Sequence, residues 1–427
     1  MDPRRRRPPT SGAAMIRVTY LLETPGDPRA MAEKIAADQS TGTFTDLPGE
    51  TDALRARHAA RVEDVTLLEP LPQPSLPEGG GPVRRARATI AFSPDSIGGD
   101  IAALLTVTTG GLFAARGLTG MRVLDFHLTP DFAAHPGPQF GIEGSRRLTG
   151  VAEGPIIASI IKPSLGLTPD QTAEVVRTLC EAGVDFIKDD EKMMSPAYSP
   201  FEARVDAVMA VIRDHEQRTG KRVMYAFGLS SADPDVMMRR HDHVVARGGN
   251  AAVVNINSIG PGAMAFLRKR SALCLHAHRN GWDLLTRHPG LGFDFRAWQK
   301  IWRLLGVDQF QINGIGAKYW EGDDSFVQSF QDVTTPIFSD TDRALPVVCS
   351  GQWGGQAFET WARTGGTLDL MYLGGGGIHG HPNGPAAGVR AIRNAWTAAG
   401  AGLTPAQAAA DCPDLAASFQ RWGMPAT

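Results

Sequence analysis

The chain has 427 residues, of which 42% are hydrophobic and 21% charged, and its 43 basic and 45 acidic side chains leave a formal charge of -2. This balance excludes the strongly basic surface typical of nucleic-acid binding, and no apolar run approaches the ~20 residues of a transmembrane helix. The four cysteines are far apart and form no CxxC pair, which argues against a disulfide framework or a zinc site. We expect a cytoplasmic protein that binds neither nucleic acid nor membranes.

The first third of the chain predicts a leader and a small α+β domain. Residues 1–15 are rich in Arg and Pro without an apolar core, so we expect a disordered leader, or a start site placed ahead of Met15. The domain predicted over 16–140 has strands among helical segments. Its expected strands are 16–22, 62–68, 88–92 and 123–128, and its expected helices are 31–37 and 98–105. The Pro/Gly-rich residues 71–82 are typical of a loop.

The remainder, 141–427, shows a regular βα rhythm. Short apolar runs recur, each followed by a polar turn and a stretch with helical periodicity. The eight expected strands are 156–161, 184–187, 222–227, 251–256, 274–278, 309–312, 346–349 and 368–373. Eight such units in this length favour a (β/α)8 barrel with closing C-terminal helices, and a doubly wound sheet is the alternative.

The second barrel strand ends in an unusual cluster of charges, Lys188-Asp189-Asp190-Glu191. Alternation along a strand turns Lys188 and Asp190 to one face, and Glu191 joins them where the strand ends. Carboxylate oxygens suit Mg2+, and a desolvated lysine is able to react with CO2 to give a carbamate, a further oxygen ligand. The alternative is a surface charge cluster at a strand end.

Other strand ends add groups to the same rim. Lys162 follows the first barrel strand, in a chain with no lysine between Lys34 and Lys162. On the fifth strand, period 2 places His276 and His278 on one face, as catalytic or as structural histidines. Glycines after the eighth strand predict a phosphate site, because their backbone N–H groups approach an anion closely, although glycines also serve tight turns.

Together these motifs resemble the RuBisCO large-subunit superfamily across nearly the whole chain. The segments that carry the resemblance are Ile161-Lys162-Pro163, Phe186 to Glu191, His276-Ala277-His278-Arg279, Ser350-Gly351, Gly374 to Gly376 and, near the N-terminus, Ser40-Thr41-Gly42-Thr43-Phe44. The resemblance implies a ferredoxin-like α+β domain before the barrel. It also implies a homodimer with its active site at the subunit interface.

The resemblance also implies roles for individual residues. Lys188 would be a carbamylated lysine that binds Mg2+ with Asp190 and Glu191, Lys162 would be the acid/base, and His278 a further catalytic group. The residues implied to hold substrate oxygens and phosphate are Thr43, Phe44, Arg279, Lys318, Ser350, Gly351, Gly374, Gly375 and Gly376.

Departures from the family pattern argue against CO2 fixation. Residues that differ from the CO2-fixing enzymes are Asp38, Gly111, Ser164 and Gln311. The chain therefore resembles the form IV, RuBisCO-like proteins. The retained groups stabilise an enolate, which serves isomerisation, enolisation or decarboxylation of a 3-keto acid.

The favoured reaction is decarboxylation of a phosphorylated 3-keto sugar acid, because loss of CO2 itself generates the enolate and needs no base. Two segments, Ser40 to Phe44 and His278 to Trp282, are similar to those of relatives that decarboxylate 3-oxo-isoapionate 4-phosphate in carbohydrate catabolism. The alternatives are a methionine-salvage isomerase or enolase, acting on methylthioribulose 1-phosphate or 2,3-diketo-5-methylthiopentyl 1-phosphate, and an inactive ligand-binding barrel.

Overall fold

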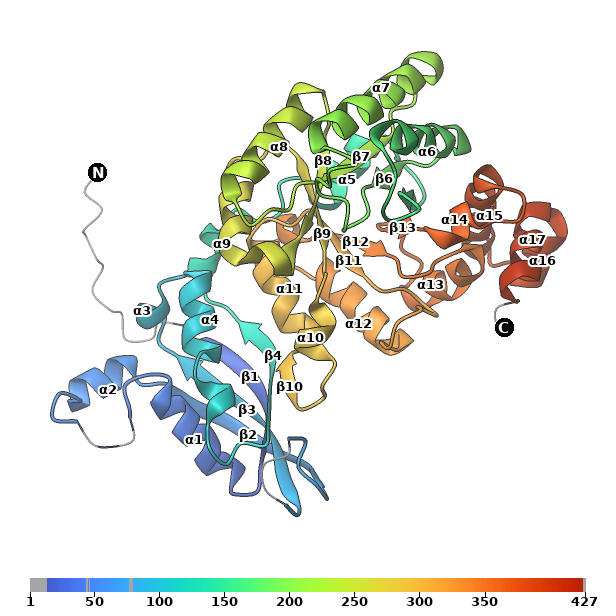
Figure 1. Ribbon diagram of the computed structural model, residues 1–427. Helices are drawn as coiled ribbons and strands as arrows, with labels where there is room; N and C mark the ends of the chain where they lie inside the picture. The colour runs from blue at the N-terminus through green and yellow to red at the C-terminus, as the bar shows by residue number, and fades with distance from the viewer. Residues whose placement is uncertain (1–13, 44, 46, 77–79, 425–427) are drawn as a thin grey trace. The chain divides into compact units, whose positions relative to one another are not determined.

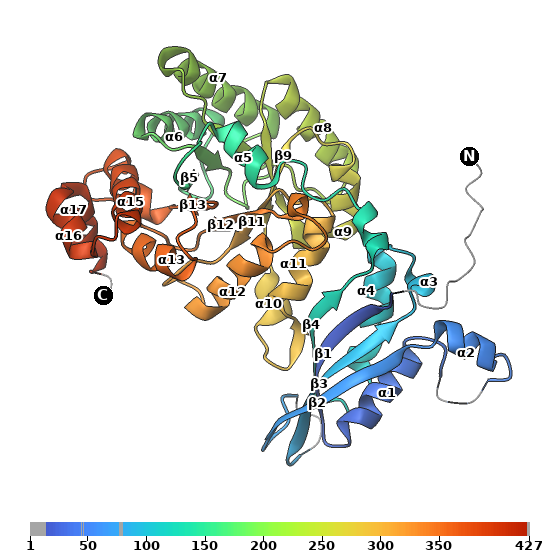
Figure 2. The same ribbon diagram turned by 180° about the vertical axis from the view of Figure 1, so that it is seen from behind.

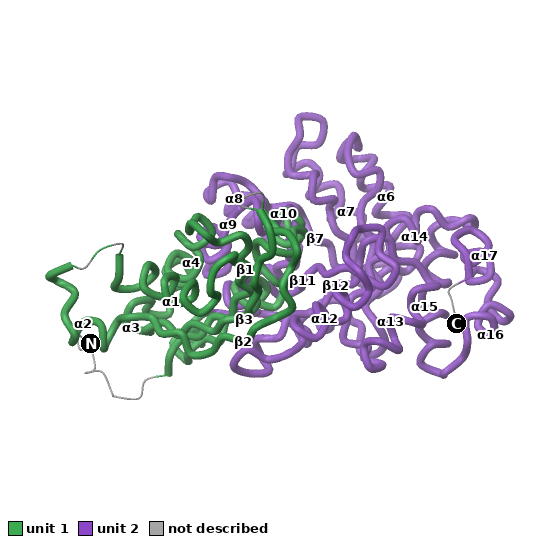
Figure 3. The backbone as a smooth tube through the Cα atoms, turned by 90° about the horizontal axis from the view of Figure 1, so that it is seen from below, with its two compact units in different colours: residues 1–135, 282–301 green, residues 136–281, 302–427 purple. Residues whose placement is uncertain are grey.

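A computed structural model describes residues 14–43, 45, 47–76 and 80–424, which belong to two compact units (Figure 3). One unit comprises residues up to 135 together with 282–301, and the other comprises 136–281 and the residues from 302 onward. All but the last two residues of the predicted leader lie outside the described part. No helix in the described part combines the length and the apolar character needed to cross a bilayer.

The first unit is built on a mixed five-stranded sheet in the order β10-β4-β1-β3-β2. Its strands are β1 (Ile16–Thr24), β2 (Arg61–Leu71), β3 (Val83–Phe92), β4 (Gly120–His127) and β10 (Leu291–Phe293). Neighbouring strands pair antiparallel, except that β10 runs parallel to β4. Its helical segments are α1 (Pro28–Asp38), α2 (Asp52–His58), α3 (Pro94–Ile97), α4 (Ile101–Thr109), η1 (Leu112–Ala114), η2 (Pro130–Ala134) and α10 (Trp282–Thr286).

Burial explains this sheet. The side chains of Val18, Tyr20 and Leu22 alternate along β1 and are fully buried, and α1 packs against β1, β2 and β3. The sequence pattern predicts neither α2 nor β10.

The second unit is a closed parallel barrel of eight strands in the order β11-β12-β13-β5-β6-β7-β8-β9. The strands are β5 (Ile156–Ile160), β6 (Phe186–Lys188), β7 (Met224–Gly228), β8 (Ala251–Asn255), β9 (Cys274–His278), β11 (Gln309–Ile312), β12 (Leu345–Val348) and β13 (Met371–Leu373). The predicted fold class, an α+β domain followed by a (β/α)8 barrel, is confirmed, and the doubly wound sheet is excluded.

Helices surround the barrel strands (Figures 1 and 2). They are α5 (Gly141–Thr149), α6 (Pro169–Ala182), α7 (Phe201–Thr219), α8 (Pro234–Ala246), α9 (Ile256–Arg268), α12 (Asp323–Thr334), α13 (Ala357–Arg363), α14 (Gly376–His379), α15 (Pro385–Gly400), α16 (Pro405–Asp411) and α17 (Pro413–Trp422), with η3 (Asp340–Asp342) and η4 (Gly354–Gln356) between them. Helix α11 (Phe295–Leu304) runs from the first unit into the second.

Local sequence explains where these helices begin and end. Helix α6 starts with a capping box between Thr168 and Gln171 and has Pro169 in its first turn. It ends at Ala182, and its C-cap is Gly183, whose φ of 88° lies in the left-handed region that glycine adopts without strain. This cap returns the chain to the barrel at β6, so the sequence around α6 fixes the start of the strand that carries Lys188.

Candidate active site

The carboxyl ends of the eight parallel strands lie on one rim of the barrel. The predicted site residues of this unit gather there: Lys162 after β5, Lys188, Asp190 and Glu191 at β6, His278 and Arg279 at β9, Lys318 after β11, Ser350 and Gly351 after β12, and Gly374, Gly375 and Gly376 after β13. The barrel topology therefore brings together residues that are far apart in the sequence.

Lys188 is buried at the centre of this rim, with 1% of its side chain exposed. Its Nζ donates to the backbone oxygen of Asp189 at 2.9 Å and lies 3.6 Å from Oε2 of Glu191. Burial lowers the pKa of Lys188, and the charges of Glu191 and Asp190 offset part of that shift. The amine is therefore closer to its neutral, nucleophilic form than the amine of an exposed lysine.

Asp190 is held by two lysines. Its Oδ2 accepts a hydrogen bond from Lys162 at 2.8 Å, and its Oδ1 lies 3.6 Å from Nζ of Lys192. Lys162 also donates to Oγ of Ser164 at 2.6 Å. Burial alone would raise the pKa of Asp190, but hydrogen bonding to Lys162 and Ser164 and the lysine charges hold it below its ordinary value. Asp190 therefore carries a negative charge at neutral pH.

His278 completes this cluster from β9. Its Nε2 lies 3.5 Å from Oε2 of Glu191. Burial and the charge of Lys188 hold its pKa well below the ordinary value, so its ring is neutral at pH 7. Nδ1 of His278 is buried and has no hydrogen-bond partner in the described part of the chain. The same holds for Oδ1 of Asn255, whose amide nitrogen donates to the backbone oxygen of Glu191 at 2.8 Å.

The donor set at β6 fits Mg2+. Within the described ranges, no three His, Cys, Asp or Glu side chains are already arranged to hold a metal ion. Asp190 and Glu191 supply two carboxylates, and a carbamate on Lys188 would supply the third oxygen group. The carboxylates of Asp190 and Glu191 pair with lysines rather than with arginines. The side-chain oxygen of Asn255 is buried and accepts no hydrogen bond in the described part of the chain. These residues are therefore compatible with a metal completed by carbamylation.

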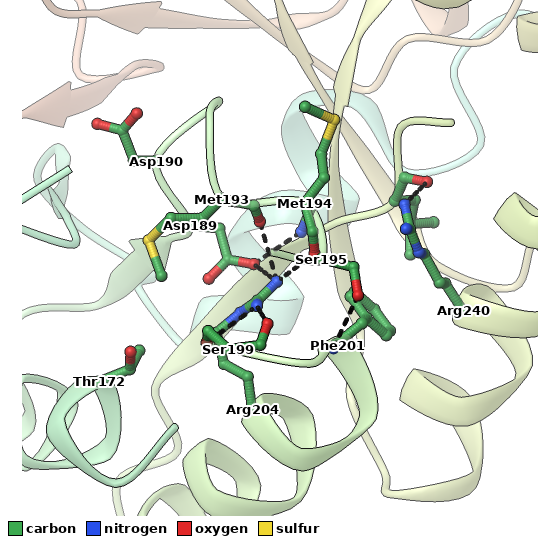
Figure 4. Close-up of polar contacts among 12 residues, drawn as sticks. Thr172, Asp189, Asp190, Met193, Met194, Ser195, Ser199, Phe201, Arg204 and Arg240 are labelled. Carbon is green, nitrogen blue, oxygen red and sulfur yellow. Dashed lines mark hydrogen bonds and ion pairs between the residues drawn. The ribbon is translucent and has the colours of Figure 1, made fainter. Parts of the chain in front are cut away.

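Asp189, by contrast, belongs to the wall of the barrel. Figure 4 shows its carboxylate turned toward Arg204 of α7, and that of Asp190 turned away from Arg204. Asp189 and Arg204 are both fully buried and pair at 3.2 Å. Oδ1 of Asp189 accepts from Tyr225 at 2.6 Å, and Oδ2 accepts from the backbone N of Gly228 at 2.9 Å.

Arg204 also fixes the loop that follows Asp190 and Glu191. Its guanidinium donates to the backbone oxygens of Met193 at 2.9 Å, Met194 at 2.8 Å and Ser199 at 3.0 Å (Figure 4). The loop between β6 and α7 is thereby tied to the first turn of α7. Arg204 thus holds the loop next to Asp190 and Glu191, while its guanidinium lies on the side away from the Asp190 carboxylate.

A second network joins the ends of β9, β11 and β12. Arg279 pairs with Glu321, with Nη1 to Oε1 at 3.4 Å and a shorter bond from Nη2 to Oε2, which also accepts from Nδ2 of Asn313. Oδ1 of Asn313 accepts from Oγ of Ser350 at 2.8 Å. Ser350 has a φ of 75°, a strained value for a residue other than glycine. The ends of β9 and β11 therefore meet at the Glu321 carboxylate, and Asn313 extends the link to the end of β12.

His276 lies below the rim, inside the barrel, and is fully buried. Its Nδ1 lies 3.0 Å from Oε1 of Gln309, and its Nε2 lies 3.0 Å from Nε2 of Gln311. The structural interpretation of this histidine therefore holds, whereas His278, two residues further along the strand, reaches the rim.

The glycine segment after β13 lies beside Lys162. A Cβ atom on Gly375 would meet Ile160 at 2.9 Å and Cε of Lys162 at 3.9 Å, whereas one on Gly376 would meet no atom within 4 Å. In the part of the chain that the structure describes, the backbone N–H groups of Gly375, Gly376 and Gly377 donate to no protein acceptor. This segment offers unpaired donors next to a lysine, which suits an anion.

The remaining predicted residues lie in loops. Lys318 is exposed, its Nζ lies 5.2 Å from the centre of the Tyr319 ring, and its backbone N donates to the oxygen of Ser350 at 3.0 Å. Thr43 is exposed in the first unit. Phe44 lies outside the described residues.

Sequence reasoning missed Arg204, Asn313 and Glu321. Arg204 lies in an ordinary amphipathic helix, and no local pattern distinguishes it from an exposed arginine. Asn313 directly follows a predicted strand, a position that could have marked it as a rim residue. Glu321 lies in a loop, and only its long-range contacts reveal its place.

The sequence profile of the ribulose bisphosphate carboxylase large chain, catalytic domain, matches residues 141–422. A Rhizobium rhizogenes protein named 3-oxo-isoapionate-4-phosphate decarboxylase is 61% identical over 95% of this chain and 98% of its own length. A Xanthobacter autotrophicus protein named 3-oxo-isoapionate-4-phosphate transcarboxylase/hydrolase is 44% identical over 95% of this chain and 99% of its own. The crystal structure of a rubisco-like protein from Burkholderia fungorum is similar with a TM-score of 0.89 and 38% identity, covering 95% of this chain and 99% of that one.

Proposed function

The chain belongs to the family of the ribulose bisphosphate carboxylase large chain, and from this premise we propose that it decarboxylates 3-oxo-isoapionate 4-phosphate without fixing CO2. The observation that carries the proposal is 61% identity to the Rhizobium rhizogenes decarboxylase over 95% of the chain. The residues at the rim of the barrel also support the proposal, because they include groups suited to stabilising an enolate and a lysine suited to protonating it.

We infer that Mg2+ binds through Asp190, Glu191 and a carbamate on Lys188. The lowered pKa of Lys188 supports this, because carbamate formation with CO2 requires the neutral amine. When bound, Mg2+ supplies the positive charge that stabilises an enolate oxygen.

Lys162 is the proposed acid. The bond between the carboxyl carbon and the α carbon breaks, CO2 leaves, and the electron pair remains as an enolate that takes a proton from Nζ of Lys162. The hydrogen bonds to Asp190 and Ser164 hold this ammonium in place, and 38% of the side chain is exposed, so solvent is able to return the proton.

His278 is the second proposed catalytic group. Its neutral ring next to Glu191, with a buried Nδ1, suits a hydrogen bond to a substrate oxygen. The unpaired N–H groups after β13 suit the phosphate of the substrate, and the ends of β9, β11 and β12 add Arg279, Lys318, Ser350 and Gly351 to the rim.

We further propose a cytoplasmic homodimer in which Thr43 and Phe44 of one subunit reach the barrel of the other. The exposure of Thr43 supports this, since its side chain is available to a neighbour. All four cysteines are free thiols and buried, which suits a reducing compartment.

The test is CO2 release from 3-oxo-isoapionate 4-phosphate by the purified protein with Mg2+ and bicarbonate. Lys188→Ala should abolish the metal-dependent activity, and Lys162→Met should remove the product-forming protonation. Lys192→Met is the matched control, because Lys192 also faces Asp190 but is 56% exposed and has no proposed role.

Three outcomes would contradict the proposal. Carboxyl transfer followed by hydrolysis, without direct CO2 release, would assign the activity named for the Xanthobacter autotrophicus relative. If NMR detects turnover of methylthioribulose 1-phosphate but not of 3-oxo-isoapionate 4-phosphate, the protein acts in methionine salvage. A fully active Lys188→Ala protein would refute the carbamate, whichever substrate is used.

A further inference from the structure

Glu321 occupies a central place in the second network of the rim. It belongs to the loop after β11, yet its side chain is only 5% exposed. Its carboxylate accepts from Arg279 at the end of β9 and from Asn313 at the end of β11. Asn313 in turn accepts from Ser350 after β12. This part of the rim is therefore one connected set of four side chains.

The charges of this set cancel. Arg279 contributes one positive charge, which the bidentate contact with Glu321 neutralises, and Asn313 and Ser350 are uncharged. Lys318 lies nearby, but it is exposed and its ammonium faces the Tyr319 ring. An exposed lysine binds an anion weakly, because water screens its charge.

The neighbouring part of the rim, at β5 and at β13, which pairs with β12, has a different character. There, Lys162 and the backbone N–H groups of Gly375, Gly376 and Gly377 lie together at the ends of β5 and β13. A phosphate placed there meets three backbone N–H groups that donate to no protein acceptor in the described structure, beside Lys162, whose ammonium also donates to Asp190 and Ser164. The strand ends of β5 and β13 thus suit an anion. The strand ends of β9, β11 and β12 offer both hydrogen-bond donors and acceptors, as a hydroxyl group requires.

We propose that Glu321 is a specificity-determining residue that restricts this site to sugar-acid monophosphates. The inference rests on the proposed function and deepens it. A second phosphate at the β9–β12 end would have to displace Glu321 from Arg279. That would leave a buried carboxylate beside a dianion and without its partner, an unfavourable arrangement. A hydroxyl group, by contrast, joins the network without breaking the ion pair.

The test compares two ligands that differ by one phosphate, ribulose 5-phosphate and ribulose 1,5-bisphosphate, by calorimetric titration of the full-length protein. We expect the wild type to bind the bisphosphate less than about threefold more tightly than the monophosphate. Glu321→Gln keeps the shape of the side chain and releases the charge of Arg279. It should raise the preference for the bisphosphate about tenfold, the effect of one charge-assisted hydrogen bond.

Asp323→Asn is the matched control. It removes the same charge two residues away, at the start of α12, where Asp323 accepts from the backbone N of Gly316 at 2.8 Å. Its preference should equal that of the wild type.

A wild-type preference of tenfold or more for the bisphosphate would overturn the inference, even if Glu321→Gln fails to fold. So would an unchanged preference in a folded Glu321→Gln protein, or an equal change in Asp323→Asn. The binding ratio needs no turnover. A failed CO2 assay would therefore refute the proposed reaction while leaving the role of Glu321 to be judged by the ratio.

Discussion

His276 is a single buried side chain that makes the stability of the barrel depend on pH. Its ring is fully buried, stacks on Phe186 with centroids 5.3 Å apart, and contacts Gln309 and Gln311 through both nitrogens. Burial, assisted by the charge of Lys188, lowers the pKa of His276 to about 3. The folded protein therefore keeps this ring neutral, whereas the unfolded chain protonates it at an ordinary pKa of about 6.5.

This difference predicts a pH-dependent stability. As pH falls from about 6.5 toward 3, the unfolded state takes up the proton and the folded state does not, so His276 destabilises the fold by about 1.4 kcal/mol per pH unit. Above that window its contribution is constant. His276→Gln should reduce the slope of unfolding free energy against pH by this amount, measured by urea denaturation between pH 7 and 5. His127→Gln, on an exposed ring, is the control, and equal slopes in all three proteins would refute the assignment.

The sequence could predict the placement of these histidines only in part. Period 2 put His276 and His278 on one face, and both do face inward. The sequence could not show that His276 would be enclosed, because its partners Gln309 and Gln311 come from a strand more than thirty residues away. The depth of a residue in the barrel depends on strand stagger, which is a property of the closed sheet.

At the scale of elements, the loop between β6 and α7 depends on one buried arginine. Arg204→Met should destabilise the protein by about 3–5 kcal/mol, because Asp189 would be left as an unpaired buried charge and three backbone oxygens would lose their donor. Asp189→Asn in the same chain should restore part of this loss. The measurement is the free energy of unfolding in urea.

Arg213→Met is the control for this loop, since Arg213 lies on the same helix and makes an exposed contact. A loss below about 1 kcal/mol in Arg204→Met would show that the buried pair contributes no more than a surface one.

The segment from β13 into α14 predicts a separation of stability from binding. A Cβ atom on Gly377 would lie 2.3 Å from the backbone oxygen of Gln352, so Gly377→Ala should destabilise the protein by about 1–3 kcal/mol. Gly376→Ala meets no protein atom and should keep the wild-type melting temperature. If this segment binds the phosphate, the new methyl group should instead raise KM about tenfold. An unchanged KM in Gly376→Ala would move the phosphate elsewhere.

The strand predictions show which information is local. All eight barrel strands were predicted, two of them with the observed bounds, because buried strands give short apolar runs between turns and helices. β10 was missed because it has three residues, all only partly buried, and forms by pairing with β4 more than 160 residues earlier. Helix α2 was missed because none of its residues is buried, so it has no apolar periodicity.

At the scale of the whole molecule, the first unit includes one segment from the middle of the barrel sequence. Residues 282–301 follow the fifth barrel strand but belong to the first unit, where Arg122 of β4 donates to the backbone oxygens of Thr286 at 2.8 Å and Leu291 at 3.0 Å. Trp282, Phe295 and Trp298 form an aromatic cluster in this segment. No periodicity in the sequence distinguishes it from a barrel connection, so only tertiary contacts assign it.

The proposed dimer predicts that two inactive proteins restore each other. Thr43→Asp places a negative charge near the phosphorylated substrate of a neighbouring barrel, without disturbing the fold because Thr43 is exposed, and Lys188→Ala disables the barrel itself. In a mixed dimer both defects fall on one site and the other site is intact. Random pairing makes half of the dimers mixed, so co-expression should restore about a quarter of wild-type activity. Lys188→Ala with Asp190→Asn, two defects of the same barrel, should restore none. If the first pair also stays inactive while size-exclusion shows mixed dimers, the site is not shared between subunits.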